Sequence, residues 1–362
     1  MAAKSLYIGL MSGTSLDGVD GVITDFSNAP SSAYIPFPAP LKNELLALQS
    51  PGVNEIHREA LAANQLAQLY ADCVAELLCM SRTSSDQVRA IGAHGQTIRH
   101  LPAEGYTRQI NNPSLLAELT SIDVIADFRS RDIAASGQGA PLVPAFHQSV
   151  FGSRSHTRAI VNIGGISNIS VLRTDGSVTG FDTGPGNVLM DAWIYQHKGK
   201  TYDADGQWAA SGMVIDALVN RLLDDDFFRQ APPKSTGRDL FHLAWLNERL
   251  AAFAEARPQD VQASLTALTA RCIADAVRTY ATDCDAVFVC GGGAHNAYLI
   301  QCLSDLIPQP VESTAALGIP PTHVEALAFA WLAQRFCDRK AGNLPSVTGA
   351  KGERLLGALY PA

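Results

Sequence analysis

Residues 7–25 read YIGLMSGTSLDGVDGVITD, and this stretch decides the expected fold. Two runs of apolar and β-branched residues flank a turn of glycines and small hydroxyl residues, a pattern typical of a β-hairpin. Because glycine adopts positive φ easily, Gly13 and Gly18 can let the turn wrap an anion such as a polyphosphate with its backbone N–H groups. An isolated turn of this kind is more often only a tight hairpin with polar caps, so the rest of the chain must decide.

The same pattern returns in the second half of the chain. Residues 159–171 again read as strand, glycine turn and strand, and in this alignment Gly165 falls on Gly13 and Ser167 on Ser15. A buried strand at 286–290 runs into a glycine-rich loop, much as the strand at 88–93 runs into His94. Two repeated patterns in the same order predict a duplicated domain.

The order of the elements predicts an α/β fold. A long helical pattern at 54–80 and a helix at 114–120 alternate with apolar strands at 88–93 and 124–127, which indicates a sheet with helices packed against it. We expect an N-terminal half at 1–134 and a C-terminal half at 135–339 with an insertion around 198–260. We expect the tail at 340–362 to pack back on the first half.

Composition excludes several classes of protein. The net charge of −8 argues against a protein that binds nucleic acid or anionic membranes electrostatically. No apolar run approaches the ~20 residues that span a bilayer, and the first residues do not form a signal peptide. The seven cysteines are odd in number and contain no C-x-x-C pair, which indicates buried thiols in a reducing cytoplasm.

A glycine hairpin in each half suits a phosphate clamp between two duplicated domains, and this arrangement resembles the sugar kinase, heat-shock ATPase and actin superfamily. The match to one family is narrower and spans nearly the whole chain. The chain resembles the anhydro-N-acetylmuramic acid kinases of bacterial cell-wall recycling in six segments that keep their order: GLMSGTSLDG at 9–18, AHGQT at 93–97, GQGAPL at 137–142, NIGGISN at 162–168, FDTGPGN at 181–187 and LPSVTGA at 344–350.

The resemblance implies two ribonuclease-H-like domains, of the actin and hexokinase ATPase type, with an active-site cleft between them. It also implies an enzyme that uses ATP and Mg²⁺, acts as a homodimer in the cytoplasm, and has no nucleic-acid or membrane partner. The enzyme would open the 1,6-anhydro ring of 1,6-anhydro-N-acetylmuramic acid with water and phosphorylate O6, giving N-acetylmuramic acid 6-phosphate and ADP.

Asp182 is the candidate catalytic residue. It follows an apolar strand and precedes a Thr-Gly-Pro-Gly turn, which can present its carboxylate as the general base for water attacking C1. The alternative is that Asp182 only caps the helix that begins near Asn187. The family resemblance favours catalysis.

The remaining candidates bind the nucleotide or the sugar. The phosphate and nucleotide candidates are Ser12, Gly13, Thr14, Ser15, Asp17, Gly18, Gly165, Gly291, Gly292, Gly293 and Asn296, with Asp17 also expected to bind Mg²⁺ through water. The sugar candidates are His94, Gln96, Arg131 and Asp132. We prefer Arg131 to Arg129 for the lactyl carboxylate, which favours a bidentate arginine. An ordinary loop or core role is the alternative for each sugar candidate, and the helix dipole is sufficient to explain Glu325.

Two other functions fit parts of the pattern. A conventional sugar kinase of the same superfamily would use one carboxylate to deprotonate a free hydroxyl group. A nucleotide-gated binding protein like actin or a heat-shock ATPase would instead need a polymer or peptide interface. ADP release that is stimulated by the anhydro sugar but not by free hexoses would distinguish an anhydro-N-acetylmuramic acid kinase from both of these alternatives.

Overall fold

The computed structural model describes residues 6–13 and 15–362, so Thr14 lies outside the described residues. The chain forms two compact units. The first comprises Met1–Phe146 together with His323–Ala362, and the second comprises His147–Thr322. Each unit is described below by itself.

The first unit contains a six-stranded sheet in the order β13-β7-β4-β1-β2-β3. Its strands are β1 (Leu6–Met11), β2 (Gly18–Thr24), β3 (Ser31–Pro36), β4 (Val88–Ala93), β7 (Val124–Ala126) and β13 (Ala358–Tyr360). β2 pairs antiparallel with β1 and β3, whereas β4 runs parallel to both β1 and β7. β1 and β4 are almost entirely buried, as their apolar sequences require for central strands of a sheet covered on both faces.

Helices cover both faces of this sheet. α13 (Val324–Cys337) lies so close to β1 and β4 that a Cβ atom at Gly9 or Gly92 would overlap the carbonyl oxygens of Ala326 and Phe329. On the opposite face, α2 (Glu55–Ser81) packs against β2, where Gly21 leaves room for helix side chains. The other elements are α1 (Ala39–Ala47), β5 (Gln96–Leu101), β6 (Tyr106–Ile110), α3 (Pro113–Thr120), α4 (Ser130–Ala134) and α14 (Pro345–Thr348), and α5 (Val143–Phe151) crosses the boundary between the units.

The second unit contains a five-stranded sheet in the order β10-β9-β8-β11-β12. Its strands are β8 (Arg158–Ile163), β9 (Ile166–Leu172), β10 (Val178–Pro185), β11 (Ala286–Cys290) and β12 (Val311–Ser313). β9 pairs antiparallel with β8 and β10, and β11 runs parallel to β8 and β12. The order and directions are the same as those of β3-β2-β1-β4-β7, which shows the duplication in the topology itself.

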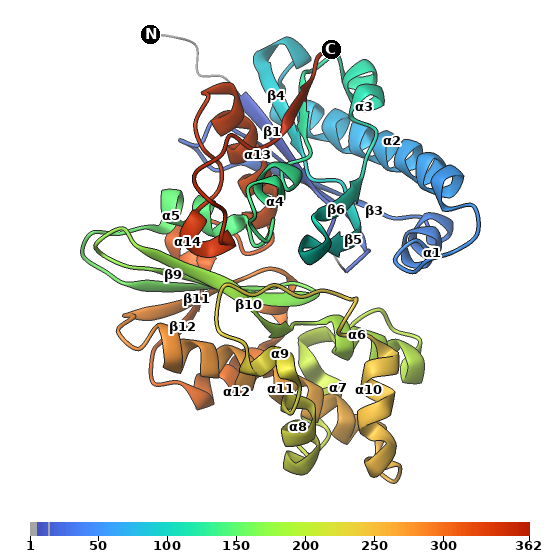
Figure 1. Ribbon diagram of the computed structural model, residues 1–362, viewed down its shortest axis with the longest axis vertical. Coiled ribbons are helices and arrows are strands. Elements are labelled where there is room, and N and C mark those ends of the chain that lie inside the picture. Colours follow the sequence, from blue (N-terminus) through green and yellow to red (C-terminus); the bar gives the residue numbers. More distant parts are fainter. Residues whose placement is uncertain (1–5, 14) are drawn as a thin grey trace. The chain divides into compact units, whose positions relative to one another are not determined.

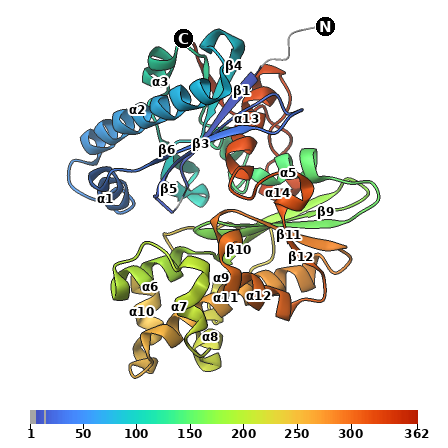
Figure 2. The same ribbon diagram turned by 180° about the vertical axis from the view of Figure 1, so that it is seen from behind.

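Helices bury one face of the second sheet. α11 (Pro258–Tyr280) packs against β9 and β10, and α12 (Ala297–Leu306) lies beside it (Figures 1 and 2). The remaining helices are α6 (Val188–Lys198), α7 (Gln207–Ala210), α8 (Asp216–Leu223), α9 (Asp226–Arg229) and α10 (Leu243–Leu250). Four of these, α7 to α10, lie in the segment 198–260 that we expected as an insertion.

The expected α/β class is confirmed. The bounds of the compact units differ from the expected halves, because the first unit continues to Phe146 and also takes in α13. β13 pairs with β7, which places the end of the chain in the first unit, and Figure 1 shows red C-terminal segments among the blue and cyan ones. Among the described residues, no helix has the length and apolar character needed to cross a bilayer.

Candidate functional site

Buried hydrogen bonds of Ser12 hold the turn between β1 and β2 in place. The Ser12 side chain is fully buried, and its Oγ atom lies 2.9 Å from the Tyr70 hydroxyl and donates to the Gly95 carbonyl over 3.1 Å. The Tyr70 hydroxyl also accepts from the Gly95 N–H over 3.1 Å. The hydroxyl group of Ser12 therefore holds the turn on the loop after β4 and does not point outward as a phosphate donor.

The outer part of the turn remains accessible. Gly13 is partly exposed, and the Ser15 hydroxyl donates to the exposed carboxylate of Asp17 over 2.7 Å. The positive φ that we expected of a glycine occurs instead at Leu16, whose φ is 56° and whose side chain is buried in the core. Gly18 is needed for a different reason, since a side chain there would overlap the Ile35 carbonyl of β3.

Three carboxylates lie near one another beside this turn. Burial, together with the negative charges of Asp17 and Glu325, raises the pKa of Asp20 on β2 to about 7. Neighbouring negative charges of this kind fit a divalent cation. Among the described residues there is no cluster of three or more His, Cys, Asp or Glu side chains that would hold a metal alone. Mg²⁺ commonly binds through one or two carboxylates, water and substrate phosphates, so the residues fit that mode.

His94 and Arg129 form a pair at the carboxyl ends of β4 and β7. Nε2 of His94 accepts from Arg129 Nε over 3.1 Å and lies 2.9 Å from Nη2, while the ring packs 4.6 Å from that of Phe329. Burial, followed by the charge of Arg129, lowers the pKa of His94 well below its usual value. The imidazole is therefore neutral and orients the arginine.

The arginines differ in how firmly they are held. Arg129 also donates from Nη1 to the Gly139 carbonyl over 2.8 Å. Arg131 is exposed, and no hydrogen bond or ion pair joins it to the other described residues. We preferred Arg131 from the sequence, and in the structure Arg129 is the arginine that hydrogen bonds hold in place. The signal that could have identified Arg129 is the His94 that precedes it in the neighbouring loop.

Asp132 and Gln96 are internal hydrogen-bonding residues. The fully buried Asp132 carboxylate accepts from Gly139 N–H at 2.8 Å, Asn343 Nδ2 at 2.7 Å and Thr348 Oγ1 at 2.8 Å. It thus ties the C-terminal segment to the loop after β7, and its oxygens face protein donors. Gln96 is also fully buried, and its Nε2 donates to the Gly13 carbonyl over 3.2 Å.

In the second unit, Asp182 lies near the end of β10 at an irregularity of the strand. The register with β9 shifts between Asp182 and Gly184, so that Thr183 forms a bulge whose hydroxyl lies 2.7 Å from that of Ser167. Asp182 is 6% exposed, and its Oδ2 accepts from the Thr236 N–H over 2.9 Å. Bulges commonly re-aim side chains beside active sites.

A buried lysine, missed in the sequence, lies beside Asp182. The Lys234 carbonyl accepts from the Asp182 N–H over 3.2 Å, so Lys234 and Thr236 both form hydrogen bonds with the aspartate. The Lys234 Nζ donates to the Phe227 carbonyl over 3.1 Å and lies 4.5 Å from the centre of the Phe227 ring. Burial lowers the pKa of Lys234, and the nearby Asp182 opposes that change. The segment Pro-Pro-Lys-Ser-Thr of the insertion was the only signal in the sequence.

The glycine turn between β8 and β9 lies against the start of α6. The Gly165 carbonyl accepts from the N–H groups of Gly186 and Val188 at 2.9 and 3.1 Å, and the Gly164 carbonyl accepts from that of Asn187 at 2.8 Å. Gly186 must lack a side chain, since a Cβ atom there would overlap the Gly164 oxygen.

The loop after β11 lies beside this turn. Gly291 has a φ of 79°, Gly293 packs against Ile163, and the exposed Gly292 faces the Asn187 side chain. The Asn296 Oδ1 accepts from the Leu299 N–H over 3.0 Å and so caps α12. The structure therefore brings Gly165 and the 291–293 loop together at one end of the second sheet, and Asn296 supports that loop.

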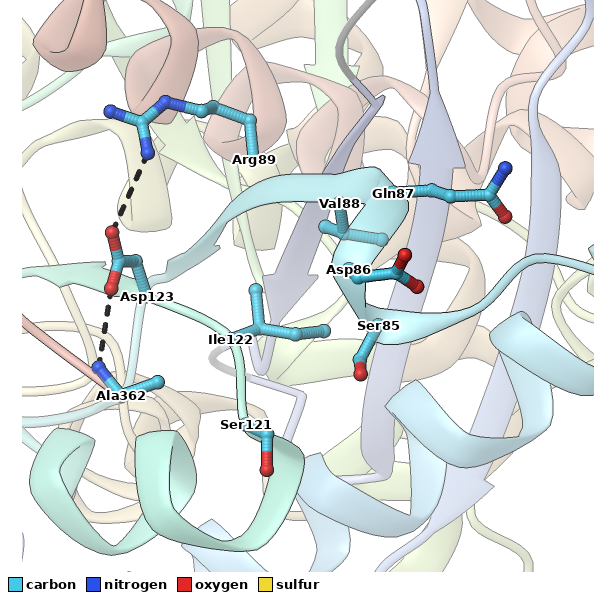
Figure 3. Close-up of a pocket in the computed structure, with 9 residues that line it drawn as sticks. All are labelled: Ser85, Asp86, Gln87, Val88, Arg89, Ser121, Ile122, Asp123 and Ala362. Carbon is cyan, nitrogen blue, oxygen red and sulfur yellow. Dashed lines mark hydrogen bonds and ion pairs between the residues drawn. The ribbon is translucent and has the colours of Figure 1, made fainter.

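A surface pocket of the first unit lies elsewhere. It forms at the amino ends of β4 and β7, where Asp123 accepts from the Ala362 N–H over 3.2 Å and lies 3.6 Å from Arg89 (Figure 3). Ligands of open α/β sheets bind at the carboxyl ends of the strands. This pocket is at the opposite end from His94 and Arg129 and is not part of the candidate site.

The matching family model and three relatives with similar sequences share the same name. The family model for "Anhydro-N-acetylmuramic acid kinase" matches residues 5–362. Proteins of that name from Burkholderia orbicola (strain MC0-3) and Paraburkholderia xenovorans (strain LB400) are 57% and 56% identical, covering 99% of this chain and 97% and 98% of their own lengths. A relative of the same name from Cupriavidus metallidurans is 55% identical, with coverage of 99% and 98%.

One solved structure shows a more distant likeness. The activator of the 2-hydroxyisocaproyl-CoA dehydratase from Clostridium difficile is 12% identical with a TM-score of 0.48, covering 91% of this chain and 97% of its own. At that score it adds nothing to the fold assignment, which rests on the strand order. Since the family model spans the described sites in both units and the relatives match along almost their entire length, the chain belongs to the anhydro-N-acetylmuramic acid kinase family.

Proposed function

We propose that this enzyme uses ATP to convert 1,6-anhydro-N-acetylmuramic acid into N-acetylmuramic acid 6-phosphate. Membership of the family over residues 5–362 carries the proposal, and it favours this reaction over a conventional sugar kinase and over a nucleotide-gated binding protein. The reaction consumes the sugar, one water and ATP, and it yields the phosphorylated sugar, ADP and a proton.

Asp182 is the general base of this reaction. Its carboxylate takes a proton from water as the water oxygen bonds to C1, and the C1–O6 bond breaks. The electron pair released on O6 attacks the γ-phosphorus, and the bond from that phosphorus to the β-phosphate oxygen breaks. The Thr236 N–H supports this role, because a hydrogen bond to a carboxylate favours its ionised form.

The glycine turns position the phosphates. Gly13, Ser15 and Gly18 are proposed to bind phosphate oxygens of ATP, and the same role is proposed for Gly165. Gly291, Gly292 and Gly293 are proposed to line the nucleotide's other end. Phosphoryl transfer needs positioning and charge neutralisation more than covalent help from the protein, and backbone N–H groups supply both.

Mg²⁺ is proposed to sit beside Asp20, Asp17 and Glu325, with Asp17 contacting it through water. When bound, the ion would neutralise charge on the phosphates. The raised pKa of Asp20 supports this placement. A test apart from turnover is Mg²⁺-induced thermal stabilisation at pH 8, which we expect in the wild type and expect to be reduced in Asp20→Asn.

For the sugar, we propose that Arg129 binds the lactyl carboxylate, that His94 orients this arginine, and that Gln96 and Asp132 hold the surrounding loops. Replacing Arg129 by Lys should raise the KM for the sugar about 10- to 100-fold and leave the KM for ATP unchanged, because the bidentate contact is lost. Arg131→Lys is the matched control, and an effect of equal size there would reverse the assignment. A homodimeric, cytoplasmic enzyme is the family expectation, and sedimentation velocity would measure the oligomeric state.

Oxygen-18 water gives the decisive test of the reaction. The label should appear on C1 of the product and be absent from the phosphate and from ADP, because O6 retains its sugar origin. The initial product should also be a single anomer with inverted C1. Early sampling and an unlabelled product control exclude slow exchange of the C1 hydroxyl. Label in the phosphate would show uncoupled ATP hydrolysis and would refute the proposal.

A further inference from the structure

Two polar side chains beside Asp182 carry buried atoms without partners. Thr236 Oγ1 and Asn168 Oδ1 are both covered from solvent, and neither makes a hydrogen bond within the part of the chain that the structure describes. Buried polar atoms are nearly always hydrogen-bonded, because leaving one unpaired destabilises the folded protein. Such atoms next to a candidate catalytic base point to a molecule that completes them.

The strand register and the loop contact bring both residues to Asp182. Asn168 on β9 is directly opposite Asp182 on β10, and directly opposite residues of antiparallel strands have their side chains on the same face. Asn168 is also opposite Asn162 on β8, so three polar residues form one row across the sheet. In addition, the Thr236 backbone N–H donates to the Asp182 Oδ2 over 2.9 Å, so Thr236 is a direct neighbour of the same carboxylate.

Neighbouring hydroxyl groups in the same region have partners. Thr183 lies next to Asp182, and its Oγ1 atom is 2.7 Å from the Ser167 hydroxyl and donates to the Ser167 carbonyl over 3.1 Å. Ser170, two residues after Asn168 on β9, lies 2.8 Å from His147 Nδ1. Asn168 and Thr236 therefore differ from these neighbouring hydroxyl groups, because each has a buried atom without a partner among the described residues.

We propose that Asn168 and Thr236 bind the water molecule that Asp182 activates. This inference rests on the proposed function. A water molecule bound in a protein usually needs two to four polar partners, and the Asp182 carboxylate, the Asn168 oxygen and the Thr236 hydroxyl supply three. Water donates one proton to Asp182 as its oxygen bonds to C1, and it keeps the other proton, which hydrogen-bonds to Asn168 or Thr236. An ordinary sugar kinase has no reactant water and no need for these partners.

Thr236→Val removes the hydroxyl and preserves the shape of the side chain. We expect kcat to fall about 10- to 100-fold, the effect of one lost hydrogen bond in a buried site, with the KM values for sugar and ATP changed less than about threefold. Thr236→Ser restores the hydroxyl and should recover most of kcat. Ser170→Ala, on the same strand as Asn168 and with a partnered hydroxyl, should lower the unfolding temperature without lowering kcat.

Asn168→Ala tests the water site by competition with methanol. Without the amide, the site holds water less firmly and has room for a methyl group, so the fraction of methyl glycoside 6-phosphate should rise several-fold above that of the wild type. A kcat within twofold of wild type in Thr236→Val, or an unchanged methanol fraction in Asn168→Ala, would overturn the inference. A wild type that does not turn over the anhydro sugar would instead overturn the proposed function, and this inference with it.

Discussion

The β1–β2 hairpin and the β8–β9 hairpin occupy the same position in two sheets of the same strand order, yet their turns are supported differently. The first turn rests on side chains, because Ser12 binds Tyr70 and Gly95 while Gln96 binds Gly13. The second turn rests on backbone, because its glycine carbonyls accept the first N–H groups around α6. The duplicated strand order has been retained while the means of holding each loop has diverged.

The third strands differ even more. β3 is largely accessible and carries none of the proposed site, whereas the equivalent β10 is buried and carries Asp182 at a bulge. In the first unit, the candidate sugar contacts follow β4 and β7 instead. In the proposed function the two copies therefore have different roles: one recognises the sugar, and the other activates water.

The largest expected effect comes from removing the carboxylate on β10. Asp182→Asn should lower kcat ~10²–10⁴-fold, the usual effect of losing a general base, and leave the circular dichroism spectrum unchanged. Ser32→Ala on the equivalent strand β3 is the control and should keep full activity. Substantial turnover by Asp182→Asn would contradict the proposal that the second unit activates water.

A second pair of variants compares the two turns through stability. Gly186→Ala forces a Cβ atom against the Gly164 carbonyl and should destabilise the protein by about 1–3 kcal/mol. Gly13→Ala should be nearly neutral in urea unfolding, because among the described residues beyond its chain neighbours the atom nearest to the added carbon, Ser15 Oγ, is 3.8 Å away. Equal losses of stability would show that the turns are supported alike.

Single substitutions can remove the side-chain hydrogen bonds of the β1–β2 turn one at a time. Ser12→Ala breaks a buried hydrogen bond to the Gly95 carbonyl and should cost about 1–2 kcal/mol of unfolding free energy. Ser15→Ala breaks only an exposed contact with Asp17 and should cost less than about 0.5 kcal/mol. If Ser15→Ala proved the more damaging of the two, the Ser12 network would not be what holds the turn.

The smallest effect concerns pH. The pKa of Asp20 is raised in the folded protein to about 7, so its contribution to stability is fully present below its unfolded pKa and is lost as pH rises through 7. Asp20→Asn lacks this loss. When both proteins are measured without Mg²⁺, the unfolding temperature of Asp20→Asn minus that of the wild type should therefore be ~2 °C higher at pH 8 than at pH 5. A difference that is constant with pH would show that Asp20 does not titrate in this range.

Sequence patterns predicted the two sheets, since apolar runs and glycine turns determine strands and hairpins locally. The placement of α13 on β1 could not be predicted from local pattern, because it depends on backbone contact at Gly9 and Gly92 between segments far apart in the chain. The roles of the polar candidates were the least predictable. Asp132 and Arg131 are adjacent and look alike as loop residues, but only the tertiary structure shows that one is buried among three donors and the other is exposed.

The first unit is built from both ends of the chain, with the whole second unit between its parts. On the ribosome, β1 to β4 emerge early but must wait for α13 to cover one face of their sheet. At about 5–20 residues per second, synthesis of the intervening residues takes roughly 10 to 35 s. During that interval the nascent sheet exposes an apolar face lined by Gly9 and Gly92, and the intervening unit can complete its own core first. Slow translation across residues 147–322 would therefore lengthen the period in which this face of the sheet is uncovered.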